Sequence, residues 1–111
     1  MKFLSSLFLT VFCLFSAYAA EVDTVEVFSK RMNKTIKNVV IRPSGKSPQA
    51  TLYLLHGYSG KYSDWVNRVA DLKNLVDKYD YLVVCPDGGF DSWYWDTADK
   101  SYQYESYIIE E

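Results

Sequence analysis

Two short apolar runs, separated by a segment with helical periodicity, most constrain the fold of this chain. The first lies within residues 50–55 and the second within residues 81–85, and each stops at a turn that contains glycine, Gly57 or Gly88. Runs of this length between turn formers are typical of strands buried in a parallel sheet. The pattern predicts a strand, helix, strand unit with a right-handed crossover and with residues 50–55 as a buried central strand.

The segment between the two runs predicts one amphipathic helix over residues 63–79. Ser63 and Asp64 suit its N-terminal end, and Lys78 lies in its last turn, which matches the helix dipole. Apolar residues recur at steps of three and four, so one face should pack on the sheet. These residues are Trp65, Val66, Val69, Leu72, Leu75, Val76 and Tyr79.

The residues before the first run predict an antiparallel hairpin at a sheet edge. Residues 24–29 and 35–41 alternate apolar and polar side chains around a polar turn. A second helical stripe starts at Tyr102 and ends unfinished at Glu111. Because one α/β domain commonly takes about 200 to 250 residues, we expect this chain to hold only the N-terminal portion of an α/β sheet.

The N-terminal residues predict a cleaved secretory signal over residues 1–19 and a domain over residues 20–111. Lys2 is followed by an apolar stretch over residues 3–15 and by the small-x-small site at residues 17–19. The apolar stretch is too short for a membrane span, so we expect a secreted or periplasmic protein without a membrane anchor.

The net charge limits the kinds of partner that we expect, and the cysteine content bears on whether a disulfide stabilises the fold. The formal net charge is −2 without a basic stripe, which argues against nucleic acid as a partner. Cys13 falls in the predicted signal, so only Cys85 would remain after cleavage and no intrachain disulfide is expected.

Several of these motifs together resemble the esterase D and antigen 85 branch of the α/β-hydrolases, and within it secreted bacterial tributyrin-esterase and feruloyl-esterase-like proteins. The resemblance covers residues 25–111 and rests on residues 52–60, Trp65, residues 84–88 and the segment 92–96. It implies an α/β-hydrolase sheet and a serine carboxylesterase without a cofactor, acting on short-chain, aryl or sugar esters with a Ser, Asp/Glu, His triad in that chain order.

No G-x-S-x-G motif occurs in the sequence, because the tetrad at residues 57–60 is followed by Lys61 instead of glycine. We therefore expect all three triad residues beyond Glu111 and no activity from this portion alone. The natural ester and the oligomeric state are not specified by these residues.

The resemblance assigns the oxyanion hole and part of the substrate site to this chain. Ester cleavage needs fixed N–H donors for a developing negative charge. By similarity, the main-chain N–H of Tyr58 is the preferred donor, with Ser59 as second choice. Gly57, Trp93 and Tyr94 are the predicted substrate contacts, since open α/β sheets bind ligands at the carboxyl ends of their strands.

Other conspicuous residues receive structural roles. His56, the only histidine, lacks an attacking group or a ligand cluster nearby, so it is predicted to hydrogen-bond main chain and not to bind metal. Asp87 and Gly88 are expected to shape a loop. Ser63 and Ser92 are expected in turns and Asp64 and Asp96 as caps. The aromatic residues that crowd the C-terminal segment could line a pocket or belong to the core. Tyr104 and Tyr107 are predicted in the core, and Trp93 and Tyr94 are the favoured substrate contacts; the set is Phe90, Trp93, Tyr94, Trp95, Tyr102, Tyr104 and Tyr107.

Two alternative functions remain open at this point. A small secreted module could use the aromatic loop to bind carbohydrate without catalysis, although it would leave an open sheet with little core. A peptidase of the same fold would keep the architecture and change the bond that is cleaved.

Overall fold

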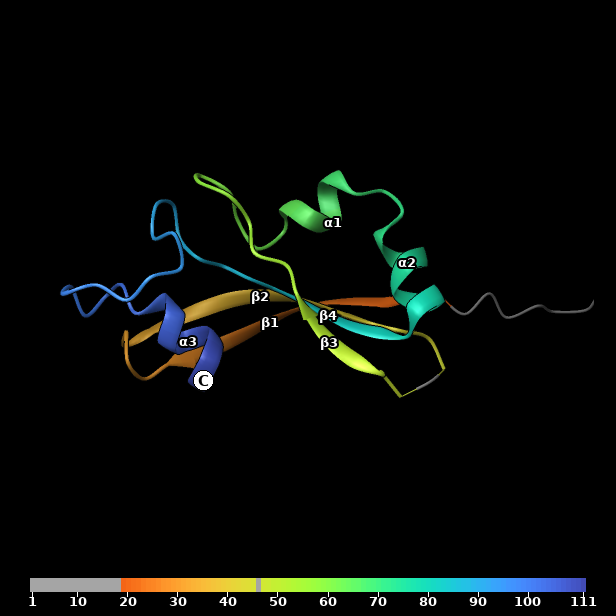
Figure 1. Ribbon diagram of the computed structural model, residues 1–111, viewed down its shortest axis with the longest axis horizontal. Helices are drawn as coiled ribbons and strands as arrows, with labels where there is room; N and C mark the ends of the chain where they lie inside the picture. The colour runs from red at the N-terminus through yellow and green to blue at the C-terminus, as the bar shows by residue number, and fades with distance from the viewer. Residues whose placement is uncertain (1–18, 46) are drawn as a thin grey trace, which may run out of the picture.

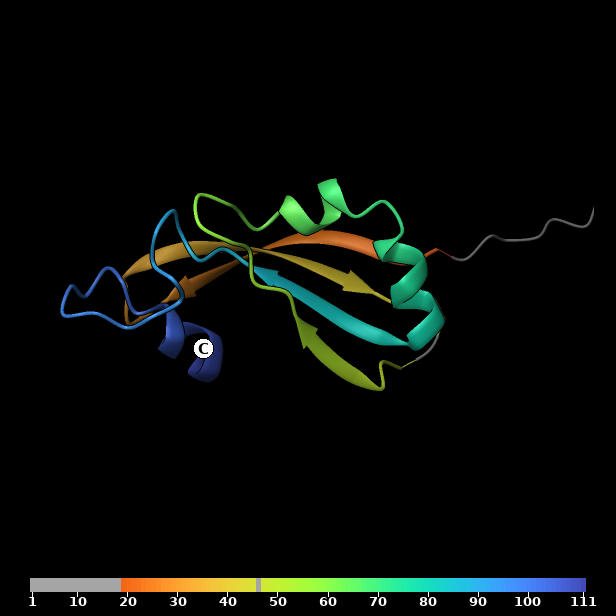
Figure 2. The same cartoon turned by 45° about the horizontal axis from the view of Figure 1, so that its top comes forward.

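The chain forms a four-stranded mixed sheet with helices on both faces. The computed structural model describes residues 19–45 and 47–111. The strands are β1 (Glu21–Ser29), β2 (Lys34–Arg42), β3 (Ala50–Tyr53) and β4 (Tyr81–Pro86), in the order β1-β2-β4-β3 (Figure 1). β2 pairs antiparallel with β1 and β4, and β3 runs parallel to β4 (Figure 2). The predicted α/β class, with an edge hairpin followed by a strand, helix, strand unit, is confirmed.

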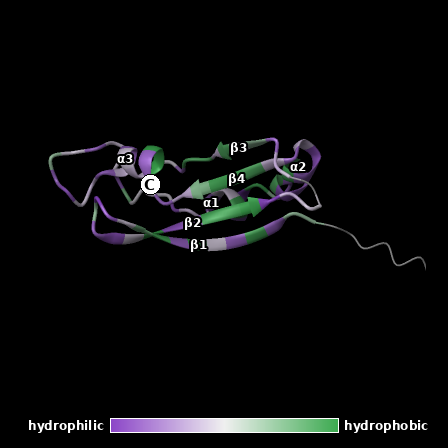
Figure 3. Ribbon diagram, turned by 90° about the horizontal axis from the view of Figure 1, so that it is seen from below, coloured by the Kyte–Doolittle hydropathy of each residue, from purple (hydrophilic) through white to green (hydrophobic). Residues whose placement is uncertain are grey.

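One face of the sheet carries the larger apolar core. Val39 and Ile41 on β2 and Val83 and Cys85 on β4 alternate toward this face, where helix α2 (Leu72–Tyr79) covers them with its buried residues. Figure 3 shows hydrophobic residues concentrated on β2 and β4 and a mixed pattern on β1. Burial raises the pKa of the free Cys85 thiol to about 11. This core is what fixes α2 on the sheet.

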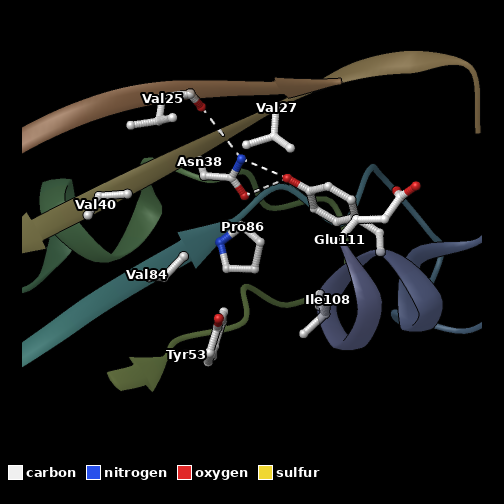
Figure 4. A pocket seen from close by; sticks show the side chains of 10 residues that line it. Val25, Val27, Asn38, Val40, Tyr53, Val84, Pro86, Ile108 and Glu111 are labelled. Atoms are coloured by element: carbon white, nitrogen blue, oxygen red, sulfur yellow. Dashed lines mark hydrogen bonds between the residues drawn. The ribbon is translucent and has the colours of Figure 1, made fainter. Parts of the chain in front are cut away.

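The opposite face is covered by helix α3 (Tyr104–Glu110) and contains a buried polar pair. The Asn38 side-chain amide donates to the Tyr107 hydroxyl at 2.8 Å, and that hydroxyl donates back to the Asn38 carbonyl oxygen at 3.0 Å (Figure 4). Leaving a buried polar group unpaired costs about 1–3 kcal/mol, so this pair fixes the position of α3. Tyr104 and Tyr107 are each 5% exposed, which confirms their prediction as core residues.

The prediction of one helix over residues 63–79 is wrong. The structure has two helices, α1 (Asp64–Arg68) and α2, and between them the backbone of Val69 leaves the helical region at φ −108° and ψ 89°. Trp65, Val66 and Val69 pack on the same apolar cluster as the buried residues of α2. The apolar periodicity therefore crosses the break, because both segments turn the same side to the sheet. Ser63 makes no side-chain cap bond.

The prediction that residues 50–55 form a buried central strand is also wrong for the described part of the chain. β3 ends at Tyr53, lies at the edge of the four-stranded sheet and has all four residues exposed. Leu52 and Tyr53 are 43% and 50% exposed. The apolar run indicated burial on two sides, but among the described residues only β4 pairs with this strand.

The predicted signal peptide falls mostly on residues that the structure does not describe. Residues 1–18 of the predicted signal peptide, Cys13 among them, lie outside the described residues. Within residues 19–45 and 47–111, no helix combines the length and apolar character needed to cross a bilayer.

Candidate active site

Two loops meet at the carboxyl ends of the parallel strands β3 and β4. The Ser59 N–H in the first loop donates to the Phe90 carbonyl oxygen in the second at 2.7 Å. Together the loops line a cavity of about 170 Å³, which is the position where open α/β sheets bind ligands. The lining residues are His56, Gly57, Tyr58, Gly88, Gly89, Phe90, Asp91, Ser92, Trp93 and Tyr94.

His56 ties the two loops together through both ring nitrogens. The Gly88 N–H donates to Nε2 at 2.9 Å, so Nε2 carries a lone pair. Nδ1 lies 2.9 Å from the Gly57 carbonyl oxygen and therefore carries the proton that it donates. The ring is then neutral, so the Asp87 carboxylate oxygen at 3.8 Å from Nε2 does not form a charged pair with it. The predicted structural role of His56, hydrogen bonding to main chain at the strand end, is confirmed.

Tyr94 forms a second connection between the ends of the two strands. Its hydroxyl accepts a hydrogen bond from the His56 main-chain N–H and donates one to the Pro86 carbonyl oxygen, both at 3.1 Å. Its ring lies where a Cβ on Gly88 would be, so no larger residue fits at that position. Burial raises the pKa of the Tyr94 hydroxyl above its ordinary value. Tyr94 was predicted as a substrate contact; it lines the cavity, while its hydroxyl is engaged with main chain.

The two predicted oxyanion donors differ in what their N–H groups do. The Ser59 N–H is committed to Phe90, and Ser59 has a left-handed backbone with φ 58°. The Tyr58 N–H takes part in none of the main-chain hydrogen bonds that the loops and turns of residues 19–45 and 47–111 form. Tyr58 and Gly57 both line the cavity. The oxyanion role of Tyr58, which the resemblance implies, stays a prediction.

An exposed aromatic rim borders the cavity. Tyr58, Phe90 and Trp93 are 59%, 60% and 66% exposed, and the Tyr58 ring centroid lies 5.1 Å from that of Phe90 and 5.9 Å from that of Trp93. Sequence reasoning favoured Trp93 as a substrate contact and left Phe90 open between pocket and core. It missed the Tyr58 side chain, because only its main-chain N–H was considered.

The turn that presents Trp93 is held by Ser92 in a backbone conformation that large residues rarely adopt. Trp93 and Tyr94 have φ values of 53° and 56°. The Ser92 hydroxyl donates to the Gly88 carbonyl oxygen and accepts the Tyr94 N–H at 2.9 Å. The expectation of Ser92 as a turn residue is confirmed, and strain of this kind often marks functional loops.

The aspartates near the site have structural roles. Asp87 accepts the Gly89 N–H at 2.7 Å and so shapes its loop, as predicted. Asp64 accepts the Lys61 N–H at 3.2 Å, and Asp96 accepts the N–H of Ser106 in the first turn of α3 at 3.0 Å, which confirms both as capping residues. In the part of the chain that the structure describes, no group of His, Cys, Asp and Glu side chains could hold a metal ion.

Known proteins share both this sequence pattern and this fold. No protein-family model matches the chain. An acetyl esterase from Caldicellulosiruptor saccharolyticus is 30% identical over an alignment of 95 residues, and the match covers 76% of this chain and 35% of that protein. The fluorophosphonate-binding serine hydrolase FphF of Staphylococcus aureus superposes with a TM-score of 0.71 at 21% identity, over 82% of this chain and 38% of that one. A ferulic acid esterase superposes with a TM-score of 0.70 at 23% identity, over 85% of this chain and 42% of that one.

This chain has the N-terminal part of an esterase-like α/β-hydrolase fold. It spans about a third of the length of the acetyl esterase that it resembles. In this α/β-hydrolase portion, the two loops at the carboxyl ends of β3 and β4 carry every site residue that the sequence predicted. Sequence reasoning missed the roles of the Tyr94 hydroxyl and the Phe90 carbonyl, because neither has a local sequence signal.

Proposed function

We propose that the whole protein is an exported serine carboxylesterase and that this chain supplies one side of its active site. The observation that carries the proposal is that Tyr58 lines the cavity on a loop fixed by His56 and Tyr94, while the neighbouring Ser59 N–H is engaged. The attacking serine and its acid and base partners belong to polypeptide beyond Glu111, so this portion is inactive by itself. The acetyl esterase and ferulic acid esterase similarities support the same assignment.

The proposed role of the first loop is electrostatic. Attack on an ester carbonyl gives a tetrahedral intermediate whose oxygen is negatively charged, both when the serine is acylated and when water releases the acyl group. The Tyr58 N–H donates to that oxygen, and the residue after the serine supplies the second donor. Because the loop is fixed before substrate binds, little reorganisation is needed when the charge develops.

The cavity and the aromatic rim support short-chain, aryl or sugar esters as the substrate class. The cavity of about 170 Å³ has room for a short acyl chain or one ring. Exposed aromatic rings such as Phe90 and Trp93 offer apolar area to an aryl group or to the face of a sugar. The same rim favours the alternative of a carbohydrate-binding module without catalysis.

The proposal is tested on the full-length gene product. We expect turnover of p-nitrophenyl acetate and covalent labelling of one serine beyond Glu111 by a fluorophosphonate probe. Replacing Tyr58 by proline removes its N–H and should lower kcat by about 10²–10³, while the matched control Tyr58→Phe keeps both the N–H and a ring and stays near the wild-type kcat. Glycan binding without turnover or labelling would favour the carbohydrate-binding alternative instead.

A further inference from the structure

The chain enters the core one residue after the predicted cleavage site. Ala19 is exposed, whereas Ala20 is 2% exposed and packs in the apolar cluster between the sheet and α2. The main-chain nitrogen of Ala20 lies 2.9 Å from Oδ2 of Asp77 on α2. The start of β1 lies beside α2 in both views (Figure 1, Figure 2). The residue that cleavage would make the first of the mature chain is therefore held by a carboxylate.

The Asp77 carboxylate divides its two oxygens between two segments. Oδ1 accepts the Ser44 N–H at 2.7 Å and the Ser44 hydroxyl at 2.9 Å, in the loop after β2. Oδ2 accepts from Ala20. The pKa of Asp77 lies below its usual value, mainly because of the hydrogen bond from the Ser44 N–H. The Ser44 hydroxyl, the Ala20 N–H and the charge of Lys73 lower it further. Asp77 is thus an ionised acceptor placed against the start of β1.

We propose that Asp77 is the receptor for the α-ammonium group that cleavage between Ala19 and Ala20 creates. In the uncleaved chain the Ala20 nitrogen is an uncharged amide with one N–H. Hydrolysis of the Ala19–Ala20 bond consumes one water molecule, leaves a carboxylate on Ala19 and gives Ala20 an ammonium group with three donors. Before cleavage the contact has one charged partner, the carboxylate, and after cleavage it has two of opposite sign 2.9 Å apart. The added Coulomb attraction strengthens the contact that attaches β1 to α2.

The contact is specific for this cleavage position. Cleavage one residue earlier would leave the ammonium on the exposed Ala19 and keep Ala20 as an amide. Cleavage one residue later would remove the Ala20 methyl group from the apolar cluster and make Glu21 the first residue. The inference depends on the predicted signal peptide and is independent of the proposed esterase activity.

The first test is a double-mutant cycle on the secreted full-length protein, after mass spectrometry of its N-terminal peptide. We expect the mature chain to begin at Ala20. The mature protein is compared with an extended form that carries Gly-Ser-Gly before Ala20, which moves the ammonium group about 10 Å away from Asp77. Both forms are measured with and without the substitution Asp77→Asn. We expect Asp77→Asn to lower the Tm of the mature form by on the order of 2–4 °C more than that of the extended form.

The matched control is Asp71→Asn, which removes an exposed carboxylate just before α2 and should lower the Tm equally in both forms. Equal effects of Asp77→Asn in both forms, or a mature chain that begins elsewhere, would overturn the proposal.

A second test needs no substitution and so does not depend on the folding of a variant. An α-amino group has an ordinary pKa of about 7.7–8.0, and pairing with Asp77 raises it. The stability that this ion pair adds is therefore fully present below about pH 7.7 to 8.0, the ordinary pKa range of an α-amino group. It is lost as the pH rises through the raised pKa of the Ala20 ammonium group. Lys73 on α2 is the other charged group that acts on Asp77 in the described chain, and it is present in both forms. We expect the Tm difference between mature and extended forms to vanish at high pH; a difference that is constant with pH contradicts the ion pair.

Discussion

The two ends of the sheet are held together by different kinds of interaction. At the carboxyl ends of β3 and β4, neutral groups make the hydrogen bonds between loops, namely the His56 ring, the Tyr94 hydroxyl and the Ser59 N–H. At the other end, where β1 begins, one ionised carboxylate on Asp77 joins two segments to α2. A carboxylate loses its negative charge on protonation, which weakens the hydrogen bonds that it accepts. Protonation of Asp77 should therefore loosen the end of the sheet where β1 begins.

The largest effect is expected from Gly88→Ala, which breaks the neutral end. The added methyl group overlaps the Tyr94 ring and forces apart the contact that joins the two loops. Overpacking of this kind costs about 1–3 kcal/mol, and esterase activity of the full-length protein should fall with it. The control is Gly57→Ala, where the new Cβ meets no atom within 4 Å. Because Gly57 lines the cavity, the comparison rests on unfolding midpoints measured for both variants. Equal losses of stability would show that the Tyr94 contact is unimportant.

A smaller loss is expected from Tyr94→Phe, which keeps the ring and removes the hydroxyl. The His56 N–H and the Pro86 carbonyl lose their shared partner in a part-buried setting, which costs about 1 kcal/mol. If the hydroxyl positions the Tyr58 loop, kcat for an ester should fall while KM changes little. Tyr79→Phe on the exposed side of α2 is the control. A reduced Tm with unchanged kcat would restrict Tyr94 to a purely structural role.

Acid that protonates Asp77 should loosen the end of the sheet where β1 begins. The pKa of Asp77 is lowered, mainly by the Ser44 N–H, from an unfolded-state value of 3.8. Its contribution to stability is therefore present above pH 3.8 and is lost as the pH falls through the lower folded-state value. We expect Asp77→Asn to flatten the acid limb of a plot of Tm against pH, which thermal scans between neutral pH and about pH 2 would measure. An unchanged acid limb contradicts this assignment.

The smallest effect is expected from Glu110→Gln. Arg31 and Glu110 form an ion pair with both side chains about half exposed, between the hairpin turn and α3. Exposed pairs contribute about 0.2–1 kcal/mol and are screened by salt. The loss of stability should shrink further in high salt, which urea titrations at two ionic strengths would detect. A loss as large as that of Gly88→Ala would mean that charge also matters at the end of the sheet that holds the site.

Local patterns in the sequence predicted most of the fold. Alternation in β1 and β2 and the apolar run of β4 are properties of single segments, so the hairpin and the parallel pair could be inferred from them. The break at Val69 could not, because α1 and α2 turn the same side to the sheet and keep one periodicity. The edge position of β3 depends on what lies beside it, which an apolar run does not specify.

The candidate site was predictable only in part for a similar reason. The structural role of His56 followed from the lack of any partner for catalysis or metal binding. The hydroxyl of Tyr94 reaches a main-chain group 38 positions earlier, and an aromatic residue gives the same sequence signal in a core, a rim or a connection between loops. Likewise, the acceptor of the Ser59 N–H lies in a different loop, at Phe90.

The thiol of Cys85 offers a built-in reporter of opening. It has no exposed surface, and with a pKa of about 11 it is almost wholly protonated in neutral solution. Alkylating reagents attack the thiolate, so they need both access and deprotonation. Modification of this sulfur should therefore proceed only when β4 separates from α2, and its rate would time that separation without any engineered label.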